Sequence, residues 1–118
     1  MKPNVLLMIA GILFLLGGIA GLFIVSGYDY TAYAGSAVAL ALGILFWLAR
    51  SAPASKTRDA IFIAGLVATL GMGLNAVYGQ WSGNYMDSAA GYIPGVIWLA
   101  LAVAFFLVGR ASMSTSAS

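Results

Sequence analysis

The sequence predicts an all-α fold: an integral membrane four-helix bundle made of two transmembrane hairpins, in one domain over residues 1–110. Hydrophobic residues make up 63% of the chain and charged residues only 7%, whereas soluble domains carry about 25% charged residues. Four apolar runs follow one another, each close to the roughly 20 residues that a helix needs to cross the hydrocarbon core. All five Lys and Arg residues fall on one side of these runs.

The first two runs predict the first hairpin. Residues 5–25 contain no polar side chain, so they are long enough and apolar enough to span the membrane. This run exceeds the roughly 7 to 15 apolar residues of a secretory signal, and no Ala-x-Ala site closes it, which favours a retained span. Residues 33–49 form the second predicted helix, in which Ser36 is the only polar residue between Tyr33 and Trp47.

The last two runs predict the second hairpin, after a polar connection that contains a proline. The third helix is expected over 60–78. The fourth is expected over 89–109, where Pro94 is either the first helical residue or kinks a helix that begins near Ser88. The small, polar segment 111–118 is expected to be a disordered tail.

The basic residues predict the orientation of the chain, because Lys and Arg near membrane spans stay on the cytoplasmic side. All of them fall on one side of the four spans: Lys2, Arg50, Lys56, Arg58 and Arg110. The other side holds all the tyrosines, whose rings favour the membrane interface: Tyr28, Tyr30, Tyr33, Tyr78, Tyr85 and Tyr92. We therefore expect a multi-pass protein of the bacterial inner membrane with both termini in the cytoplasm.

The chain lacks the residues that most catalytic, metal and cofactor sites require. It contains no Cys, His or Glu, which removes the usual ligands of zinc, haem and iron–sulfur clusters and the His base of a serine nucleophile. No ionisable residue lies inside a predicted span, so a proton relay or voltage sensor would lack its charged groups. The formal charge of +2, without a basic stripe, argues against nucleic acid. We expect neither enzymatic activity nor a cofactor.

Small residues recur at helical spacing and predict close packing, since they let helix backbones approach within lipid. The expected packing residues are Gly17 and Gly21 in the first run, Gly35, Ala39 and Gly43 in the second, and Ala64, Ala68, Gly71 and Asn75 in the third. The opposite face of the third helix is expected to hold Phe62, Leu66, Leu70 and Val77. Two interpretations stay open: the small faces build the protein's own bundle, or one of them docks a partner subunit.

Three polar residues near the outer side form the one candidate ligand site. Asp29, Asn84 and Asp87 could bind a hard cation such as calcium or perform acid–base chemistry. Asp and Asn are also common in turns, where their side chains bond to the nearby backbone. Asn75, inside the third span, has two interpretations as well: a hydrogen bond between helices or a contact with a ligand.

Several features occur together along the chain: a Gly-rich first run, a second run ending in Leu45-Phe-Trp-Leu-Ala-Arg50, a short basic connection, and a Gly/Ala-rich third run with Asn75. In these the chain resembles the small four-helix bacterial inner-membrane proteins called DoxX-like, over nearly its whole length. The resemblance implies the four-helix architecture. Some members of that group are linked to respiratory or redox membrane assemblies, and the resemblance implies no site residues.

The function predicted from these observations is non-catalytic. Spans without reactive groups and abundant small-residue faces favour an accessory or scaffolding subunit in the lipid bilayer, packed against other membrane protein subunits or against copies of itself. The alternative is a small oligomeric carrier or channel for an uncharged or lipidic solute, with a path lined by Ser36, Thr69 and Asn75.

Overall fold

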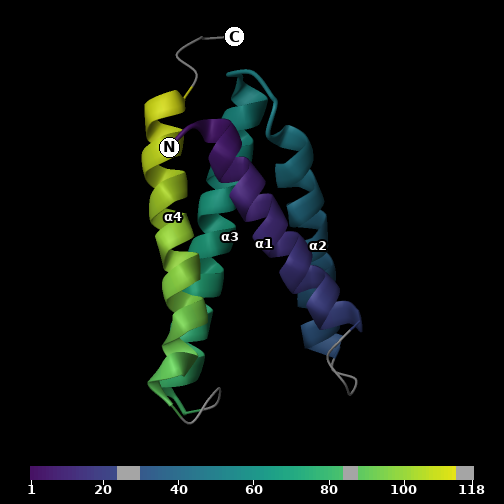
Figure 1. Ribbon diagram of the computed structural model, residues 1–118, viewed down its shortest axis with the longest axis vertical. Coiled ribbons are helices and arrows are strands. Elements are labelled where there is room, and N and C mark those ends of the chain that lie inside the picture. Colours follow the sequence, from purple (N-terminus) through teal and green to yellow (C-terminus); the bar gives the residue numbers. More distant parts are fainter. Residues whose placement is uncertain (24–29, 84–87, 114–118) are drawn as a thin grey trace. The chain divides into compact units, whose positions relative to one another are not determined.

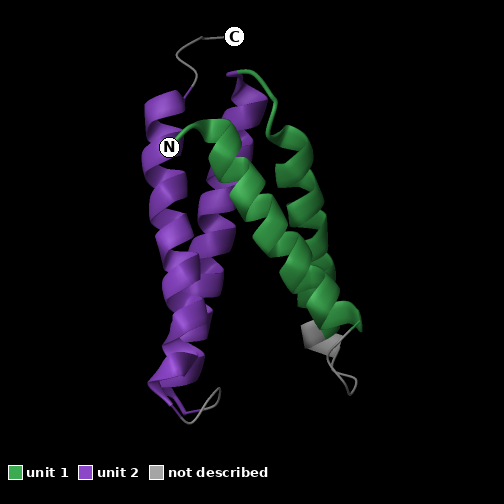
Figure 2. Ribbon diagram, viewed as in Figure 1, with its two compact units in different colours: residues 1–53 green, residues 54–118 purple. Residues whose placement is uncertain are grey.

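The chain folds into two helical hairpins (Figure 1). The computed structural model describes residues 1–23, 30–83 and 88–113, and every regular element in these ranges is a helix. The elements are α1 (Pro3–Phe23), α2 (Tyr30–Ala49), α3 (Lys56–Trp81), the short 3-10 helix η1 (Ala89–Tyr92) and α4 (Ile93–Ser112). Helices α1 and α2 lie in unit 1, Met1–Pro53, and the remaining elements lie in unit 2, Ala54–Ser118 (Figure 2). The all-α prediction is confirmed for the described residues.

Three helical segments are long and apolar enough to cross a membrane. They are α1, with 21 residues, α3, with 26, and Ala89–Ser112, with 24. At about 1.5 Å per residue, α1 is roughly 31 Å long, which matches the hydrocarbon thickness of a bilayer. The described apolar part of α2, Tyr33–Ala49, is shorter. These helices and the composition indicate a membrane protein, and α2 as the fourth span stays a prediction.

The first hairpin follows the predicted order with shifted helix ends. α1 begins at Pro3 instead of 5, because the fixed φ of proline suits the first helical turn. α2 begins at Tyr30 instead of 33. Residues 30–32 contain neither Gly nor Pro, so nothing in their backbone chemistry breaks a helix. The predicted end of the first helix, 24–25, lies outside the described residues.

The start of α3 is earlier than predicted because polar residues cap it. The helix begins at Lys56 instead of 60. The Ser55 hydroxyl accepts a hydrogen bond from Arg58 N at 3.2 Å, as a helix N-cap does. Asp59 lies in the first turn, where the helix dipole favours a negative charge. Residues 56–59, at the end of the polar connection between the two hairpins, are therefore helical.

The end of α3 is also later than predicted, at Trp81 instead of 78. Ser82 N donates to Tyr78 O at 2.9 Å, which continues the helical hydrogen bonds past the predicted end. Gly83 has a φ of 80°, a left-handed conformation that glycine adopts at low cost and that ends many helices.

The start of α4 lies close to the first predicted alternative, since the helix begins at Ile93 and Pro94 is its second residue instead of its first. Pro94 lies in the first turn of α4, where a missing N–H costs no hydrogen bond. Ser88 does not begin this helix. It precedes the single turn of η1 instead, and α4 follows directly from that turn.

The end of α4 corrects the predicted start of the tail at 111. The helix continues to Ser112, because hydrogen bonds satisfy the polar groups of its last turn. The Ser112 hydroxyl donates to Val108 O at 2.6 Å. Arg58 Nη2, from the first turn of α3, donates to Ser112 O at 2.9 Å. Residues 114–118 lie outside the described part of the chain.

Candidate helix-packing and interaction surfaces

In unit 1 the two helices touch at a pair of buried glycines, Gly11 in α1 and Gly43 in α2. A Cβ atom added to Gly11 would lie 3.0 Å from Trp47 N and 3.2 Å from Gly43 O. One added to Gly43 would lie 2.6 Å from Leu15 N and 3.0 Å from Gly11 O. The backbone of each helix thus occupies the space where a side chain of the other would stand, which is the close approach that small residues permit in membranes.

Two phenylalanines pack against each other beside this contact. Phe14 and Phe46 each follow one of the two glycines by three residues, and both are buried. Their rings pack edge to face, with centroids 5.5 Å apart and an interplanar angle of 66°. Further along, a Cβ added to Gly18 would lie 2.8 Å from Leu40 Cβ, so the close contact continues toward the loop between the helices.

Unit 2 contains a second glycine pair, Gly73 in α3 and Gly95 in α4. A Cβ added to Gly73 would lie 3.0 Å from Leu99 N. One added to Gly95 would lie 3.2 Å from Val77 N and 3.3 Å from Gly73 O. In both units each glycine therefore faces the backbone amide four residues beyond the partner helix's glycine. The two hairpins use the same close-packing geometry.

Two phenylalanines also pack against each other in the α3–α4 contact of unit 2, nearer to the start of α3. Phe62 and Phe105 pack edge to face, with centroids 5.6 Å apart and an interplanar angle of 69°. The Phe105 ring covers Gly65, and an atom of the Phe62 ring would lie 3.2 Å from a Cβ added to Gly109. Thr69 is completely buried, and its hydroxyl donates to Gly65 O at 2.7 Å. Each large ring thus fills the space left by a glycine on the other helix.

The packing face of α3 within unit 2 is the reverse of the predicted one. The face that meets α4 holds buried residues: Phe62, Gly65, Thr69 and Gly73. The predicted face lies on the other side, with Ala64, Gly71 and Asn75 exposed and Ala68 half-buried. The prediction was wrong for this contact because rings set against glycines bring more atoms into van der Waals contact than a row of small residues does. Helical spacing alone could not choose between the two faces.

The predicted packing residues of α1 and α2 fall into two groups. Gly21, Ala39 and Gly43 are in the contact: the two glycines face atoms of the opposite helix, and Ala39 is buried. Gly17 and Gly35 are exposed, and no described residue outside their own helix lies within 4 Å of a Cβ added to either. The predicted small-residue faces of these helices are therefore only partly used inside the hairpin.

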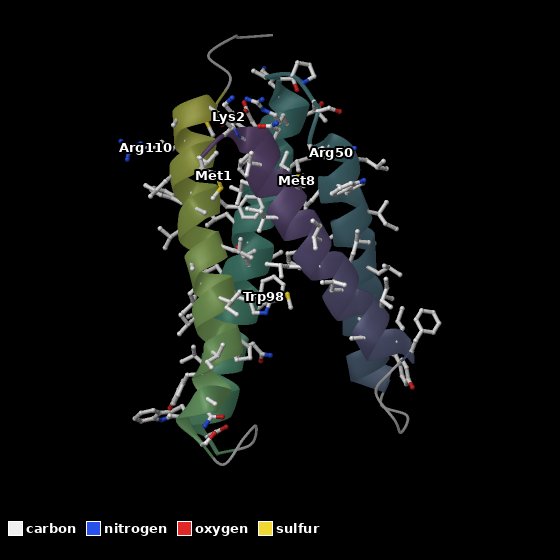
Figure 3. All side chains as sticks on the ribbon, viewed as in Figure 1. Met1, Lys2, Met8, Arg50, Trp98 and Arg110 are labelled. Carbon is white, nitrogen blue, oxygen red and sulfur yellow. The ribbon has the colours of Figure 1, made fainter. Side chains whose placement is uncertain are left out.

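Each hairpin has basic residues at the end where its first helix begins and its second helix ends. In unit 1, Lys2 precedes α1 and Arg50 follows α2 (Figure 3). The Arg50 guanidinium lies 4.1 Å from the centre of the Trp47 ring and donates to Trp47 O at 2.6 Å. In unit 2, the bond from Arg58 to Ser112 joins the start of α3 to the end of α4. This arrangement agrees with the predicted one-sided distribution of charge within each hairpin.

The predicted ligand site on the outer side lies outside the described residues, since Asp29, Asn84 and Asp87 all fall in the gaps. Within the described ranges, no three His, Cys, Asp or Glu side chains group as metal ligands would. Asn75 is exposed on α3, and no described residue hydrogen-bonds to its carboxamide. The expected hydrogen bond between helices is therefore not part of the α3–α4 contact.

Three of the four glycines in the two reciprocal backbone contacts were not among the predicted packing residues: Gly11, Gly73 and Gly95. The sequence does mark Gly11 as a packing residue, because Gly-Ile-Leu-Phe occurs twice, at 11–14 and 43–46. No such repeat marks the glycine pair of unit 2, whose flanking residues differ on the two helices.

Comparison of the chain with family models, with curated proteins and with solved structures finds no match. The surfaces described above therefore carry the functional inference.

Proposed function

We propose that the protein is a non-catalytic accessory or scaffolding subunit that packs against a larger membrane assembly. The observation that supports this most is a helical face of small residues that α3 leaves outside its own hairpin contact. This open face of α3 consists of Ala60, Ala64, Ala68, Gly71, Asn75 and Gly79, and every member is exposed or half-buried. Apart from the helix's own backbone, no described residue has an atom within 4 Å of a Cβ added to Gly71 or to Gly79.

The open face of α3 suits a neighbouring membrane helix. Small residues let two backbones approach in lipid, where packing replaces the hydrophobic drive between helices. Asn75 adds a carboxamide to the same face, and a polar group inside a span is costly unless it is bonded. Hydrogen bonds between membrane helices contribute about 0.6 to 2 kcal/mol. The partner we propose is a transmembrane helix of another subunit that offers a carbonyl or hydroxyl opposite Asn75.

An oligomeric carrier or channel is the second candidate, and its predicted lining residues support it less. Thr69 is buried and donates its hydroxyl to Gly65 O within its own helix. Ser36 lies against Gly21 inside the α1–α2 contact. Of the three predicted lining residues, Asn75 alone is exposed, and one amide does not make a polar path.

We further propose that the protein lies in the bacterial inner membrane, that α2 is its fourth span and that both chain ends are in the cytoplasm. The basic residues at one end of each hairpin support this orientation. Reporter fusions after Ser55 and after Ser118 should report the cytoplasm, and a fusion after Ser82 should report the outside. An exported signal from the Ser118 fusion would contradict the four-span topology.

Gly71→Leu is expected to release the protein from its assembly without unfolding the hairpin. The new side chain would stand between α3 and the partner helix, and a loss of about 1.4 kcal/mol lowers partner binding about tenfold. The measurement is affinity purification in mild detergent, with the partner quantified against the tagged chain. Leu70→Phe is the control, because Leu70 is exposed on α3 about 100° around the helix from Gly71, outside the open face.

Thermal unfolding in detergent checks the fold, and Gly71→Leu should keep the wild-type midpoint. Asp29→Asn and Asp87→Asn should leave partner binding unchanged. A wild-type chain that purifies alone would contradict the proposal. So would a loss of binding in the Asp variants but not in Gly71→Leu, and that result would place the functional site on the outer side.

A further inference from the structure

The stretch Gly-Ile-Leu-Phe-x-Leu occurs twice in unit 1, at 11–16 in α1 and at 43–48 in α2. The two copies also share a pattern of burial along the helix. In both, the Gly and the Phe are buried, the Ile and the final Leu are exposed, and the variable fifth residue is half-buried. The same side of each copy therefore takes part in the α1–α2 contact.

The contacts between the two copies are reciprocal. Gly11 faces the amide of Trp47, 3.0 Å from an added Cβ, and Gly43 faces the amide of Leu15 at 2.6 Å. Leu15 and Trp47 occupy the same place in the motif. Phe14 packs against Phe46, and these two residues also occupy equivalent positions in the motif. Exchanging the two copies maps each contact onto itself, as in an interface with two-fold symmetry, in which one surface recognises itself.

We infer that Gly-Ile-Leu-Phe-x-Leu is a helix-recognition motif whose partner is a second copy of the motif on an antiparallel helix. The glycine leaves a space, the backbone of the partner fills it, and the paired rings close the contact. Lipid provides no hydrophobic drive between spans, so this fit of shapes selects the neighbour. The inference goes beyond the proposed accessory role, because it concerns how α1 selects α2 and holds whichever assembly the protein joins.

Unit 2 indicates which part of the motif gives specificity. Gly73 and Gly95 make the same reciprocal contact with backbone amides. The residues three positions after them are Ala76 and Trp98, so this pair has no phenylalanines beside it. The backbone contact is thus common to both hairpins, and the adjoining Phe pair distinguishes the α1–α2 contact from the α3–α4 contact. Specificity requires such a difference between competing partners.

The chain contains no Cys, so an engineered pair reports the α1–α2 contact without background. Gly21→Cys with Ser36→Cys is suitable, because a Cβ at Gly21 lies 2.8 Å from Ser36 Cβ, while Ser36 Cα is 3.9 Å away. A small outward adjustment reaches the Cβ–Cβ distance of about 3.5 to 4.5 Å in a disulfide. We expect this reporter pair, in the full-length protein in membranes, to cross-link when an oxidant is added.

Two changes to the reporter chain test whether the α1–α2 contact depends on the order of residues in the motif or only on its composition. Trp47→Leu makes the two copies of the motif identical, and the disulfide yield should stay unchanged. Leu13→Phe with Phe14→Leu keeps the composition and hydropathy but moves the ring off the buried position. The yield should then fall about tenfold, because the edge-to-face pair and its packing are lost.

A second cysteine pair in unit 2 controls for insertion and folding of the exchanged chain. Gly95→Cys with Val77→Cys is suitable, because a Cβ at Gly95 lies 2.6 Å from Val77 Cγ2. This pair should oxidise equally with and without the Leu13 and Phe14 exchange. An equal yield from the Gly21 and Ser36 pair in both chains would overturn the inference, because any apolar sequence would then suffice.

If the exchange abolishes both disulfides, Phe14→Leu alone decides the matter, since it keeps a branched apolar side chain at the position. The inference requires that Phe14→Leu lowers the unit 1 yield and leaves the unit 2 yield intact. An unchanged unit 1 yield, or an equal fall in both units, would overturn it.

Discussion

Gly43→Leu is expected to separate α1 from α2. A side chain at this position meets Leu15 N at 2.6 Å and Gly11 O at 3.0 Å, and both are backbone atoms of α1. Backbone atoms cannot rotate aside as a flexible side chain can, so the helices must move apart along the whole contact. Overpacking of this kind costs about 3 kcal/mol or more. The measurement is the free energy of unfolding in detergent, with helix content as the signal that monitors unfolding.

Gly35→Leu is the matched control for this prediction, because it places the same side chain on the same helix. Gly35 is exposed, and within the described ranges no atom outside its own helix lies within 4 Å of its added Cβ. Its effect on the free energy of unfolding should stay within about 0.5 kcal/mol, as for other surface substitutions. Similar losses for the two variants would mean that Gly43 does not lie at the closest approach of the helices.

Phe105→Ala is expected to weaken the α3–α4 hairpin by about 2 to 3 kcal/mol. The Phe105 side chain is 1% exposed, covers Gly65 and packs against Phe62. Its removal leaves a cavity and breaks an edge-to-face pair worth about 0.5 to 1.5 kcal/mol. The loss falls below that of a Phe→Ala change in a soluble core, because lipid is as apolar as the interior and the transfer contribution is small.

The neighbouring Phe106 provides the control. It is 49% exposed on the same helix, so Phe106→Ala removes the same atoms from a position outside the contact. Its loss should stay below about 0.5 kcal/mol. If Phe106→Ala destabilises the protein as much as Phe105→Ala does, the two rings have exchanged roles and the assigned face of α4 is wrong.

The number and order of the helices could be predicted from the sequence, because uncharged apolar runs of this length are typical of membrane-spanning helices. Helix ends were harder to predict. The start of α3 depends on Ser55 as an N-cap and on Asp59 in the first turn, so a segment that composition assigned to a loop is helical. Likewise, Ser112 belongs to α4 because Arg58, 54 residues earlier, bonds to its carbonyl.

The packing faces could be predicted only in part. The row of small residues on α3 is real, but Phe62 and Gly65 on the other side make the contact with α4. Spacing shows that two faces exist and cannot tell which one meets which neighbour. In unit 1 the repeated Gly-Ile-Leu-Phe did carry that information, because its two copies face each other. The candidate site at Asp29 and Asp87 stays a prediction.

Photo-crosslinking in intact membranes tests most directly whether the open face of α3 meets another subunit. A photoreactive amino acid replaces Ala64, on that face, or Ile63, which is exposed beside it. We expect the probe at 64 to give one discrete adduct that contains a peptide of another membrane protein, and the probe at 63 to give lipid adducts. Lipid adducts from both positions, or a crosslink from 64 back into the chain itself, would contradict the proposed role as an accessory subunit.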